Sequence, residues 1–303
     1  MTDWDDIAKR LADFGVVERD RKLATLTSFG VGGDARIVIE PFDKNSLADC
    51  IRIIWDENLP YYVIGKGTNL LVSDNGFDGI IVKIDGGIDK IEHLDGSLWH
   101  WESGASLKSA IEKCIESGFG GIEQLAGIPG SVGGATVMNA SAYGVSFFDK
   151  VKSVEILSRE NGIQKFSSNE LEPTYRGIEI ADGSIVISVD IALDRVSPEL
   201  AREEIAKYLS LRAENQPIDK KSAGCIFKNP EGLYAGKLIE DAGLKGFKIN
   251  DAMVSPVHSN FIVNNGKASA TDIMKLIEII RKKVFEKFSV ELELEVKTLG
   301  FEL

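Results

Sequence analysis

The sequence has few residues of the kinds that bind metals or form disulfides. Its three cysteines, Cys50, Cys114 and Cys225, lie far apart, and its three histidines are equally scattered. This spacing excludes a CxxC metal or redox motif, and an odd number of distant cysteines argues against a disulfide framework. We therefore predict no metal site and no stabilisation by disulfides.

The sequence also lacks a long apolar run and a targeting segment. No stretch approaches the roughly 18 apolar residues of a membrane span. The opening MTDWDDIAKRLADFG has neither the basic nor the apolar region of a signal peptide, and it predicts an amphipathic helix with an acidic start. No low-complexity tract and no fixed-period repeat is present. These features predict a cytoplasmic protein without a membrane partner.

Positive charge is in short supply. Lys and Arg number 35 against 47 Asp and Glu, a formal net charge of -12. Such an excess of acid argues against a nucleic-acid partner, so an anionic small ligand must be bound by local donors. With 303 residues, 44% of them hydrophobic, the chain is large enough for two or three packed subdomains.

The first third of the chain predicts a compact α+β unit. The glycine-rich stretch TSFGVGGDARIVIEP, residues 27–41, predicts a turn that leads into an apolar strand ending at Pro41. A helix fits residues 45–56. Residues 61–84 then indicate three strands separated by tight turns.

The middle third predicts short strands, with a helix near residues 106–118. Two of the strands fit VKSVEILS and SIVISVDIAL, residues 151–158 and 184–193. A helix at about 197–214 ends before Pro217, and we expect it to connect two parts of the molecule.

The last third predicts a helix at 235–242 and an apolar strand at NFIVN. A longer amphipathic helix fits residues 270–288, where Ser269 and Asp272 have the spacing of a capping box. Strict alternation of apolar and charged residues over 290–297 predicts a half-buried strand.

Two glycine-rich blocks are candidate anion sites. In GKGTN, residues 65–69, the glycines free backbone N–H groups to point at an anion, and Thr68 and Asn69 add donors. The block is not a P-loop, since Lys66 precedes a glycine, and Leu70 replaces the third glycine of a dinucleotide fingerprint. Alone, the block favours a plain tight turn.

The second block changes that balance. GIPGSVGGA, residues 127–135, holds four glycines around Ser131. Because glycines carry an entropic cost, a fold keeps them where backbone must approach something closely. Two such loops about sixty residues apart suit a dinucleotide that lies across two subdomains.

Six blocks in order resemble the UDP-N-acetylenolpyruvoylglucosamine reductase family: VIGKGTNLLV, AGIPGSVGGA, MNASAYG, SAGCIFKNP, LIEDAGLKGF and LELEVK. The resemblance runs from about residue 27 to residue 300. It implies an α+β fold, in which a two-subdomain FAD-binding region of the vanillyl-alcohol-oxidase (PCMH) type precedes an α+β substrate-binding domain. Only 48 residues, 177 to 224, separate Arg176 from Cys225, so the chain is similar to the shorter type that lacks an inserted substrate loop.

The resemblance also implies boundaries and an activity. We expect a helical segment at 1–26, FAD-binding subdomains at 27–84 and 85–196, and a substrate-binding domain at 197–303. The implied reaction converts UDP-N-acetylglucosamine enolpyruvate to UDP-N-acetylmuramate in peptidoglycan synthesis. NADPH reduces non-covalently bound FAD, hydride from the reduced flavin adds to C3 of the substrate, and a proton adds to C2.

Three residues match the catalytic positions of the family. Arg176, in PTYRGIEI, would bind the charge that develops, since a guanidinium is always charged and forks onto a carboxylate. Cys225 would donate the proton. Glu295 cannot stabilise an enolate while ionised, so we expect it to be protonated or to share a proton with the substrate carboxylate.

Further positions carry over as binding residues. Asn229 and Lys297 match substrate-contacting positions. The implied cofactor-binding residues are Gly65, Lys66, Gly67, Thr68, Asn69, Gly130, Ser131, Gly133, Gly134, Asn139 and Gly144.

The chain departs from the family at two points. The family usually has serine where Cys225 stands, and a thiol, with a reference pKa of about 8.5, is a far stronger acid than a serine hydroxyl. The family also usually has a serine after its Tyr-Arg pair, which the sequence GIEI lacks.

Without the resemblance, plainer interpretations are favoured. Cys225 would be an inert packed thiol, Arg176 a surface residue, Glu295 part of a solvated face and His258 a satisfied loop histidine. Two other functions stay open: an FAD-dependent oxidase of the same fold, and a non-catalytic flavin- or nucleotide-binding protein. The sequence gives no prediction of oligomeric state.

Overall fold

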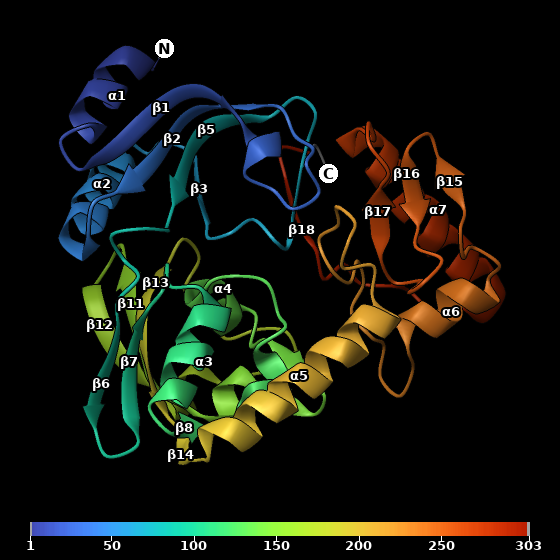
Figure 1. Ribbon diagram of the computed structural model, residues 1–303. Coiled ribbons are helices and arrows are strands. Elements are labelled where there is room, and N and C mark those ends of the chain that lie inside the picture. Colours follow the sequence, from blue (N-terminus) through green and yellow to red (C-terminus); the bar gives the residue numbers. More distant parts are fainter. Residues whose placement is uncertain (1, 302–303) are drawn as a thin grey trace. The chain divides into compact units, whose positions relative to one another are not determined.

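The computed structural model describes residues 2–301, whose contacts group them into two units (Figure 1). Unit 1 comprises residues 2–19, Arg36–Lys66 and Gly79–Ser210. Unit 2 comprises Asp20–Ala35, Gly67–Asp78 and residues 211–301. The contiguous boundaries at 27, 85 and 197 stay a prediction.

All helices except α4 (Val132–Val137) lie where the sequence predicts them. The helices are α1 (Trp4–Leu11), α2 (Lys44–Asp56), α3 (Leu107–Glu116), α4, α5 (Pro198–Asn215), α6 (Ala235–Asp241) and α7 (Ala270–Phe288). All but α4 are confirmed predictions. Their starts have physical causes: Asp43 accepts a hydrogen bond from the Ser46 N–H at 2.8 Å at the start of α2, and Ser269 and Asp272 form the expected capping box of α7.

Unit 1 contains two larger sheets. The first has the order β1 (Gly15–Lys22), β2 (Asp34–Pro41), β5 (Phe77–Lys83), β3 (Tyr61–Ile64), and β3 and β5 are parallel. The second has the order β12 (Gly162–Ser167), β11 (Val151–Ser158), β13 (Ile185–Ala192), β7 (Leu98–Glu102), β6 (Ile91–Asp95). Two short pairs complete the unit: β9 (Ser141–Ala142) with β10 (Val145–Ser146), and β8 (Phe119–Gly120) with β14 (Asp194–Arg195).

Each of these sheets has its own apolar core. The helices α1 and α2 cover the first sheet through residues such as Leu11, Leu47 and Ile51. The helices α3 and α4 cover one face of the second sheet (Figure 1). Trp99 and Trp101 of β7 are buried in this core. Ile185 and Ile187 near the start of β13 belong to the first core, so the two sheets form a single unit.

Unit 2 is built around α7, whose apolar side chains pack on a sheet of short strands. This sheet has the order β15 (Lys248–Ile249), β16 (Ala252–Val254), β17 (Ile262–Asn264), all antiparallel (Figure 1). A second, parallel pair joins β4 (Leu70–Val72) to β18 (Lys297–Leu299). In residues 2–301, no helix has both the length and the apolar character required to cross a membrane.

The strand predicted over 290–297 is wrong. Within that range only Lys297 belongs to a strand, β18. The preceding residues run beside Ile226–Lys228 with a single bridge, and the N–H groups of Glu295 and Val296 both donate to the Ile226 carbonyl, at 2.8 and 3.3 Å. Two donors opposite one acceptor break the regular ladder. Leu292 and Val296 are nevertheless buried, so the alternation reports burial of an extended segment.

Candidate active site

The two glycine-rich blocks meet in unit 1. Gly65, at the end of β3, lies so close to Ser131 that a Cβ atom added at Gly65 would collide with the Ser131 hydroxyl. The sequence places these residues in separate blocks, and the fold brings them into contact. The chain passes from unit 1 to unit 2 inside the first block, between Lys66 and Gly67.

The second block is not wholly a loop, which corrects the prediction. Helix α4 begins at Val132, and the Ser131 hydroxyl caps it by accepting a hydrogen bond from the Gly134 N–H at 3.2 Å. Backbone bonds fix the start of the block: the Gly130 carbonyl accepts from the Leu107 N–H at 3.1 Å, and the Val132 N–H donates to the Ala105 carbonyl at 2.8 Å. The loop expected at 130–135 is therefore a rigid turn followed by a short helix.

Gly133 and Gly134 differ in what surrounds them. A Cβ atom on Gly133 would lie 2.8 Å from the Cβ of Ser103, so a side chain there is blocked by protein. Gly134 is exposed, and a Cβ there would meet only the Ser131 hydroxyl at 3.5 Å. The protein itself therefore requires glycine at Gly133, while Gly134 faces open space.

Asn139 positions the loop that carries Arg176. Its side-chain amide donates to the Thr174 carbonyl at 3.0 Å and accepts from the Phe148 N–H at 3.2 Å. The side chain of Asn139 thus contacts backbone on both sides. Gly144, with φ of 83°, forms the tight turn between β9 and β10.

Arg176 lies at the tip of a turn in unit 1. Thr174 and Gly177 form a bridge across the turn, and Arg176 has a left-handed φ of 68°. Its guanidinium donates from Nη1 to the Ser141 hydroxyl at 2.8 Å and lies 5.1 Å from the Tyr175 ring centroid. A half-buried guanidinium held in this way is suited to a carboxylate ligand.

Lys66 is already paired inside unit 1. Its ammonium lies 3.6 Å from Asp85, and Asp85 also lies 3.2 Å from Lys83. Lys83 in turn contacts Glu40 at 2.9 Å. Lys66, a predicted cofactor-binding residue, therefore belongs to a network in which positive and negative side chains alternate.

In unit 2, Asn69 connects the first glycine-rich block to the segment of Glu295. The Asn69 amide donates to the Glu295 carbonyl at 3.1 Å, and the Asn69 carbonyl accepts from the Lys297 N–H at 3.1 Å. Before it, Gly67 has a φ of 61°, and its carbonyl accepts from the Ser28 N–H at 3.0 Å. The two hydrogen bonds of Asn69 thus fix the backbone at Glu295 and Lys297.

Cys225 lies in a half-buried loop of unit 2, unlike the other two cysteines. Burial in α2 and α3 raises the pKa of Cys50 and Cys114 to about 12. Cys225 is half-buried, and its backbone forms an isolated β-bridge with that of Phe261. The preceding residue, Gly224, has a φ of 77°, which favours glycine, although no atom lies close to the position of a Cβ there. The next residue, Ile226, accepts from the Glu295 N–H at 2.8 Å. The loop of Cys225 and the segment of Glu295 are therefore adjacent and hydrogen-bonded.

Three other residues singled out in the sequence lie nearby in unit 2. The Asn229 side-chain oxygen accepts from the Ala235 N–H at 3.0 Å at the start of α6. Lys297 is exposed. His258 accepts at Nδ1 from the Asn260 N–H at 3.3 Å, and burial lowers its pKa. This geometry fits the interpretation of His258 as a satisfied loop histidine.

The sequence did not single out two buried polar residues that touch these regions. Ser103 packs against Gly133, and Asn260 binds the backbone next to Cys225. No motif marks either residue, because each acts through a contact with a segment distant in the chain.

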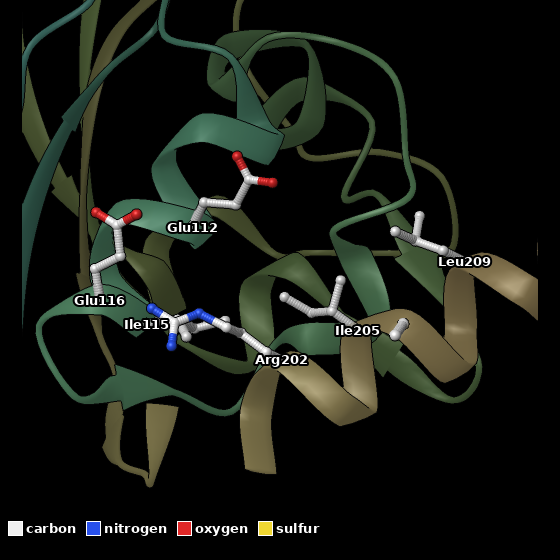
Figure 2. A pocket seen from close by; sticks show the side chains of 7 residues that line it. Glu112, Ile115, Glu116, Arg202, Ile205 and Leu209 are labelled. Carbon is white, nitrogen blue, oxygen red and sulfur yellow. The ribbon is translucent and has the colours of Figure 1, made fainter. Parts of the chain in front are cut away.

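Unit 1 also has a separate hollow of about 250 Å³ between α3 and α5. Figure 2 shows its lining, with Glu112 and Glu116 on one side and Arg202 on the other. Ile115 and Leu209 are among its apolar lining residues. None of the predicted site residues lines this hollow.

Comparisons with known proteins match both parts of the chain. A family model described as "FAD binding domain" matches residues 35–167. Another, described as "UDP-N-acetylenolpyruvoylglucosamine reductase, C-terminal domain", matches residues 216–299. The two matched ranges lie in the same order as in the predicted architecture.

Relatives match nearly the whole chain. A UDP-N-acetylenolpyruvoylglucosamine reductase of Caldanaerobacter subterraneus subsp. tengcongensis is 40% identical over 296 residues, 97% of each chain. One from Clostridium novyi is 38% identical over 301 residues, 98% of this chain and 97% of that one.

Solved structures agree. The crystal structure of the UDP-N-acetylenolpyruvylglucosamine reductase from Thermus caldophilus matches with a TM-score of 0.82 and 34% identity, covering 95% of this chain and 100% of that one. A berberine bridge enzyme variant, a reticuline dehydrogenase, matches with a TM-score of 0.50 and 15% identity over 64% of this chain and 44% of that one, and so shares the fold alone. The predicted fold class, a vanillyl-alcohol-oxidase-type FAD-binding region followed by an α+β domain, is confirmed. With identity of this level over almost its full length, the chain belongs to the UDP-N-acetylenolpyruvoylglucosamine reductase family.

Proposed function

We propose that the chain reduces UDP-N-acetylglucosamine enolpyruvate to UDP-N-acetylmuramate, a step of peptidoglycan synthesis, with non-covalent FAD as cofactor and NADPH as hydride donor. The observation that carries this is the 40% identity over 97% of the chain to a reductase of that name. The oxidase and the non-catalytic binding protein are set aside, because the relatives that match the whole chain are named reductases.

The glycine-rich blocks fit a dinucleotide cofactor. Gly134 is exposed and leaves room for a ligand next to the backbone. The Ser103 hydroxyl, packed beside Gly133, is buried and has no hydrogen-bond partner among residues 2–301. An exposed glycine backbone that a ligand can approach closely, beside a hydroxyl with a hydrogen bond to give, fits a pyrophosphate. Bound beside these blocks, FAD would supply the hydride transfer from NADPH to C3 of the enolpyruvyl group.

The further cofactor residues divide into two kinds. Gly65, Gly67 and Gly130 shape the backbone of the two blocks, and Thr68 and Lys66 offer polar donors. Asn139 and Gly144 act through the loops that they shape, since the side-chain amide of Asn139 already binds backbone.

Arg176 and Glu295 handle the substrate carboxylate and the charge that develops beside it. We assign Arg176 the role of binding this carboxylate, because its half-buried guanidinium is oriented by a 2.8 Å bond to Ser141 and such a fork stabilises an enolate. Glu295 takes part as a carboxylic acid or as a carboxylate that shares a proton with the substrate, since a second full negative charge would oppose the reaction. Asn229 and Lys297 bind other parts of the substrate.

Cys225 donates the proton to C2. A free thiol has a reference pKa of about 8.5, so it is mostly protonated near neutral pH and is still a much stronger acid than serine. Of the three cysteines, only Cys225 is not fully buried. Its loop is hydrogen-bonded to the segment of Glu295, as the 2.8 Å bond from the Glu295 N–H to Ile226 records.

An anaerobic two-step titration tests the proposal. NADPH should bleach the flavin of the purified protein, and UDP-N-acetylglucosamine enolpyruvate added under nitrogen should restore the oxidised spectrum. Cys225→Ala should keep the first step and slow the second by about 100-fold or more, the usual contribution of general acid catalysis. Cys225→Ser, with a proton to give, should keep a substantial part of the second step.

Two results would count against the proposal. If the enolpyruvyl sugar failed to reoxidise the flavin of the wild type, the activity would be wrong. If Cys225→Ala reoxidised its flavin at the wild-type rate, the activity would stand and the proton-donor role would be wrong.

The cytoplasm is the location we propose, since NADPH and nucleotide-linked sugars are made there. We also propose that the partners are the two small molecules alone, without nucleic acid or membrane, consistent with a formal net charge of -12. Cell fractionation tests this directly: activity recovered in the membrane pellet would contradict it.

A further inference from the structure

We infer that Asn260 is a positioning residue that holds the loop of Cys225 in register with the segment of Glu295. Asn260 is 3% exposed and lies in the turn between β16 and β17. It makes three hydrogen bonds to the two residues that follow Cys225. The inference rests on the proposed roles of Cys225 and Glu295, and it adds a residue that no family motif above includes.

The contacts of Asn260 close around one peptide segment. Its side-chain oxygen accepts from the Phe227 N–H at 3.0 Å, and its side-chain NH₂ donates to the Phe227 carbonyl at 2.8 Å. Its backbone carbonyl accepts from the Ile226 N–H at 2.8 Å. The amide of one side chain thus replaces the paired bonds that a neighbouring strand would give.

The same segment is bound on its other side by the residues around Glu295. The Ile226 carbonyl accepts from the Glu295 N–H at 2.8 Å, and the Lys228 N–H donates to the Glu293 carbonyl at 2.9 Å. Residues 226–228 therefore lie between Asn260 and the segment of Glu295. Only isolated bridges, not a regular ladder, join these segments, so the side chain of Asn260 supplies a large share of the register.

The chemical consequence is a requirement on distance. A proton donor works only within hydrogen-bond reach of the atom it protonates. A displacement of about 1 Å in an active site can slow a reaction roughly 100-fold. Loss of the two side-chain bonds of Asn260 would leave the N–H and carbonyl of Phe227 unpaired in a buried place, and the loop would shift to satisfy them.

The test compares Asn260→Ala with Asn264→Ala in the FAD-loaded protein. Asn264 is a matched control: it is 5% exposed, lies in the same unit, and its side chain also makes three backbone hydrogen bonds, to Phe29, Gly266 and Ala268. None of those three bonds involves residues 225–228. Both variants therefore lose a similar buried network.

Stopped-flow absorbance separates the two half-reactions. In Asn260→Ala, reoxidation of flavin by UDP-N-acetylglucosamine enolpyruvate should fall by about 10- to 100-fold, while reduction by NADPH changes by less than about threefold. Asn264→Ala should affect both steps by less than about threefold. The inference is overturned if the two variants behave alike, or if Asn260→Ala slows both half-reactions equally.

Alkylation of Cys225 gives a readout that does not depend on catalysis. The rate of its modification by iodoacetamide, followed by mass spectrometry from pH 6 to 9, should rise at least about fivefold in Asn260→Ala, because a released loop exposes the half-buried thiol. It should be unchanged in Asn264→Ala. If Cys225→Ala turns over normally, the proton-donor role fails, and the alkylation result still decides whether Asn260 holds the loop.

Asn260→Asp serves where the alanine variant does not fold. The carboxylate has the same shape and still accepts from the Phe227 N–H, but it cannot donate to the Phe227 carbonyl. It should slow reoxidation by about 10-fold while sparing reduction. Wild-type rates in both steps, together with wild-type alkylation, would contradict the inference.

Discussion

The interior of unit 1 and the interior of unit 2 are stabilised by different kinds of contact. Unit 1 has sheets of four and five strands, and regular backbone ladders join strands of up to eight residues. Unit 2 has strands of two or three residues. In unit 2, hydrogen bonds of polar side chains join chain segments in the way that backbone ladders join strands in unit 1.

Three side chains illustrate the point. Asp74 accepts hydrogen bonds from the N–H groups of Ala270 and Thr271, both at 2.8 Å, at the start of α7. Asn264 donates to the Phe29 carbonyl at 3.0 Å, and Asn69 to the Glu295 carbonyl at 3.1 Å. Each bond joins positions about 200 residues apart in the chain. Polar side chains from distant positions in the chain therefore fix the backbone of unit 2.

The largest expected difference between the units concerns their thiols. With a pKa of about 12, Cys50 and Cys114 of unit 1 hold roughly one thiolate in ten thousand at pH 8. Cys225 of unit 2 is half-buried in a loop. At pH 8, iodoacetamide should therefore modify Cys225 at least about 100-fold faster than either of the others, as measured for each peptide by mass spectrometry.

Two controls belong to this measurement. In urea all three thiols should react at similar rates, and bound substrate should protect Cys225 in the folded protein. If Cys114 were modified as fast as Cys225, unit 1 would open as readily as unit 2. The expected difference between the thiols of the two units would then be wrong.

The next effect concerns the backbone of unit 1. Gly134→Ala meets no steric obstacle and should raise the free energy of unfolding of the apoprotein by about 0.5–1 kcal/mol. It should nevertheless weaken FAD binding by about 10-fold if the cofactor lies against that backbone. Gly133→Ala should instead destabilise the apoprotein by about 1–3 kcal/mol, because its Cβ would press on Ser103.

Flavin fluorescence titration and urea unfolding separate these outcomes. Gly86→Ala is the control, since no atom lies within 4 Å of the added Cβ. Wild-type FAD affinity in Gly134→Ala would remove Gly134 from the proposed cofactor site.

The smallest expected effect is a pH-dependent one in unit 2. Burial acts to raise the pKa of Asp74, but hydrogen bonds from Thr271 and Ala270 outweigh it and lower the pKa below the ordinary carboxyl value. A carboxyl whose pKa is lowered by folding stabilises the protein above its unfolded pKa, and that stabilisation is lost as pH falls through the folded pKa. Asp74→Asn should therefore cost about 1 kcal/mol at pH 7, and this difference should shrink as the pH falls below about 4, the ordinary carboxyl pKa.

Asp43→Asn in unit 1 supplies the comparison. A backbone hydrogen bond from Ser46 lowers the pKa of Asp43, but this cap joins residues only three apart. Urea unfolding of both variants between pH 7 and about pH 3 should give the larger change in the free energy of unfolding for Asp74→Asn. A larger loss for Asp43 would show that long-range polar contacts are not what distinguishes unit 2.

Local signals predicted the helices well. The periodicity and capping box of residues 269–288 placed α7 within a residue, and the turn residues before β2 and between β3 and β5 placed those strands. The same reasoning was wrong at 290–297, because alternation reports which side chains are buried and is silent on whether a partner strand is in register. It also treated 130–135 as a loop, since glycines disfavour a helix that capping by Ser131 and backbone contacts nevertheless fix.

By itself, the sequence determined the family, the fold class and the three residues proposed for catalysis, because the motifs and their order can be read directly along the chain. Tertiary structure alone decided that Gly65 meets Ser131, that Asn69 holds the backbone of Glu295, and that Asn260 binds the segment after Cys225. These are contacts between positions 33 to 226 residues apart. A hydrogen bond depends on distance in space, and local propensities along the chain carry no record of which distant segments will pair.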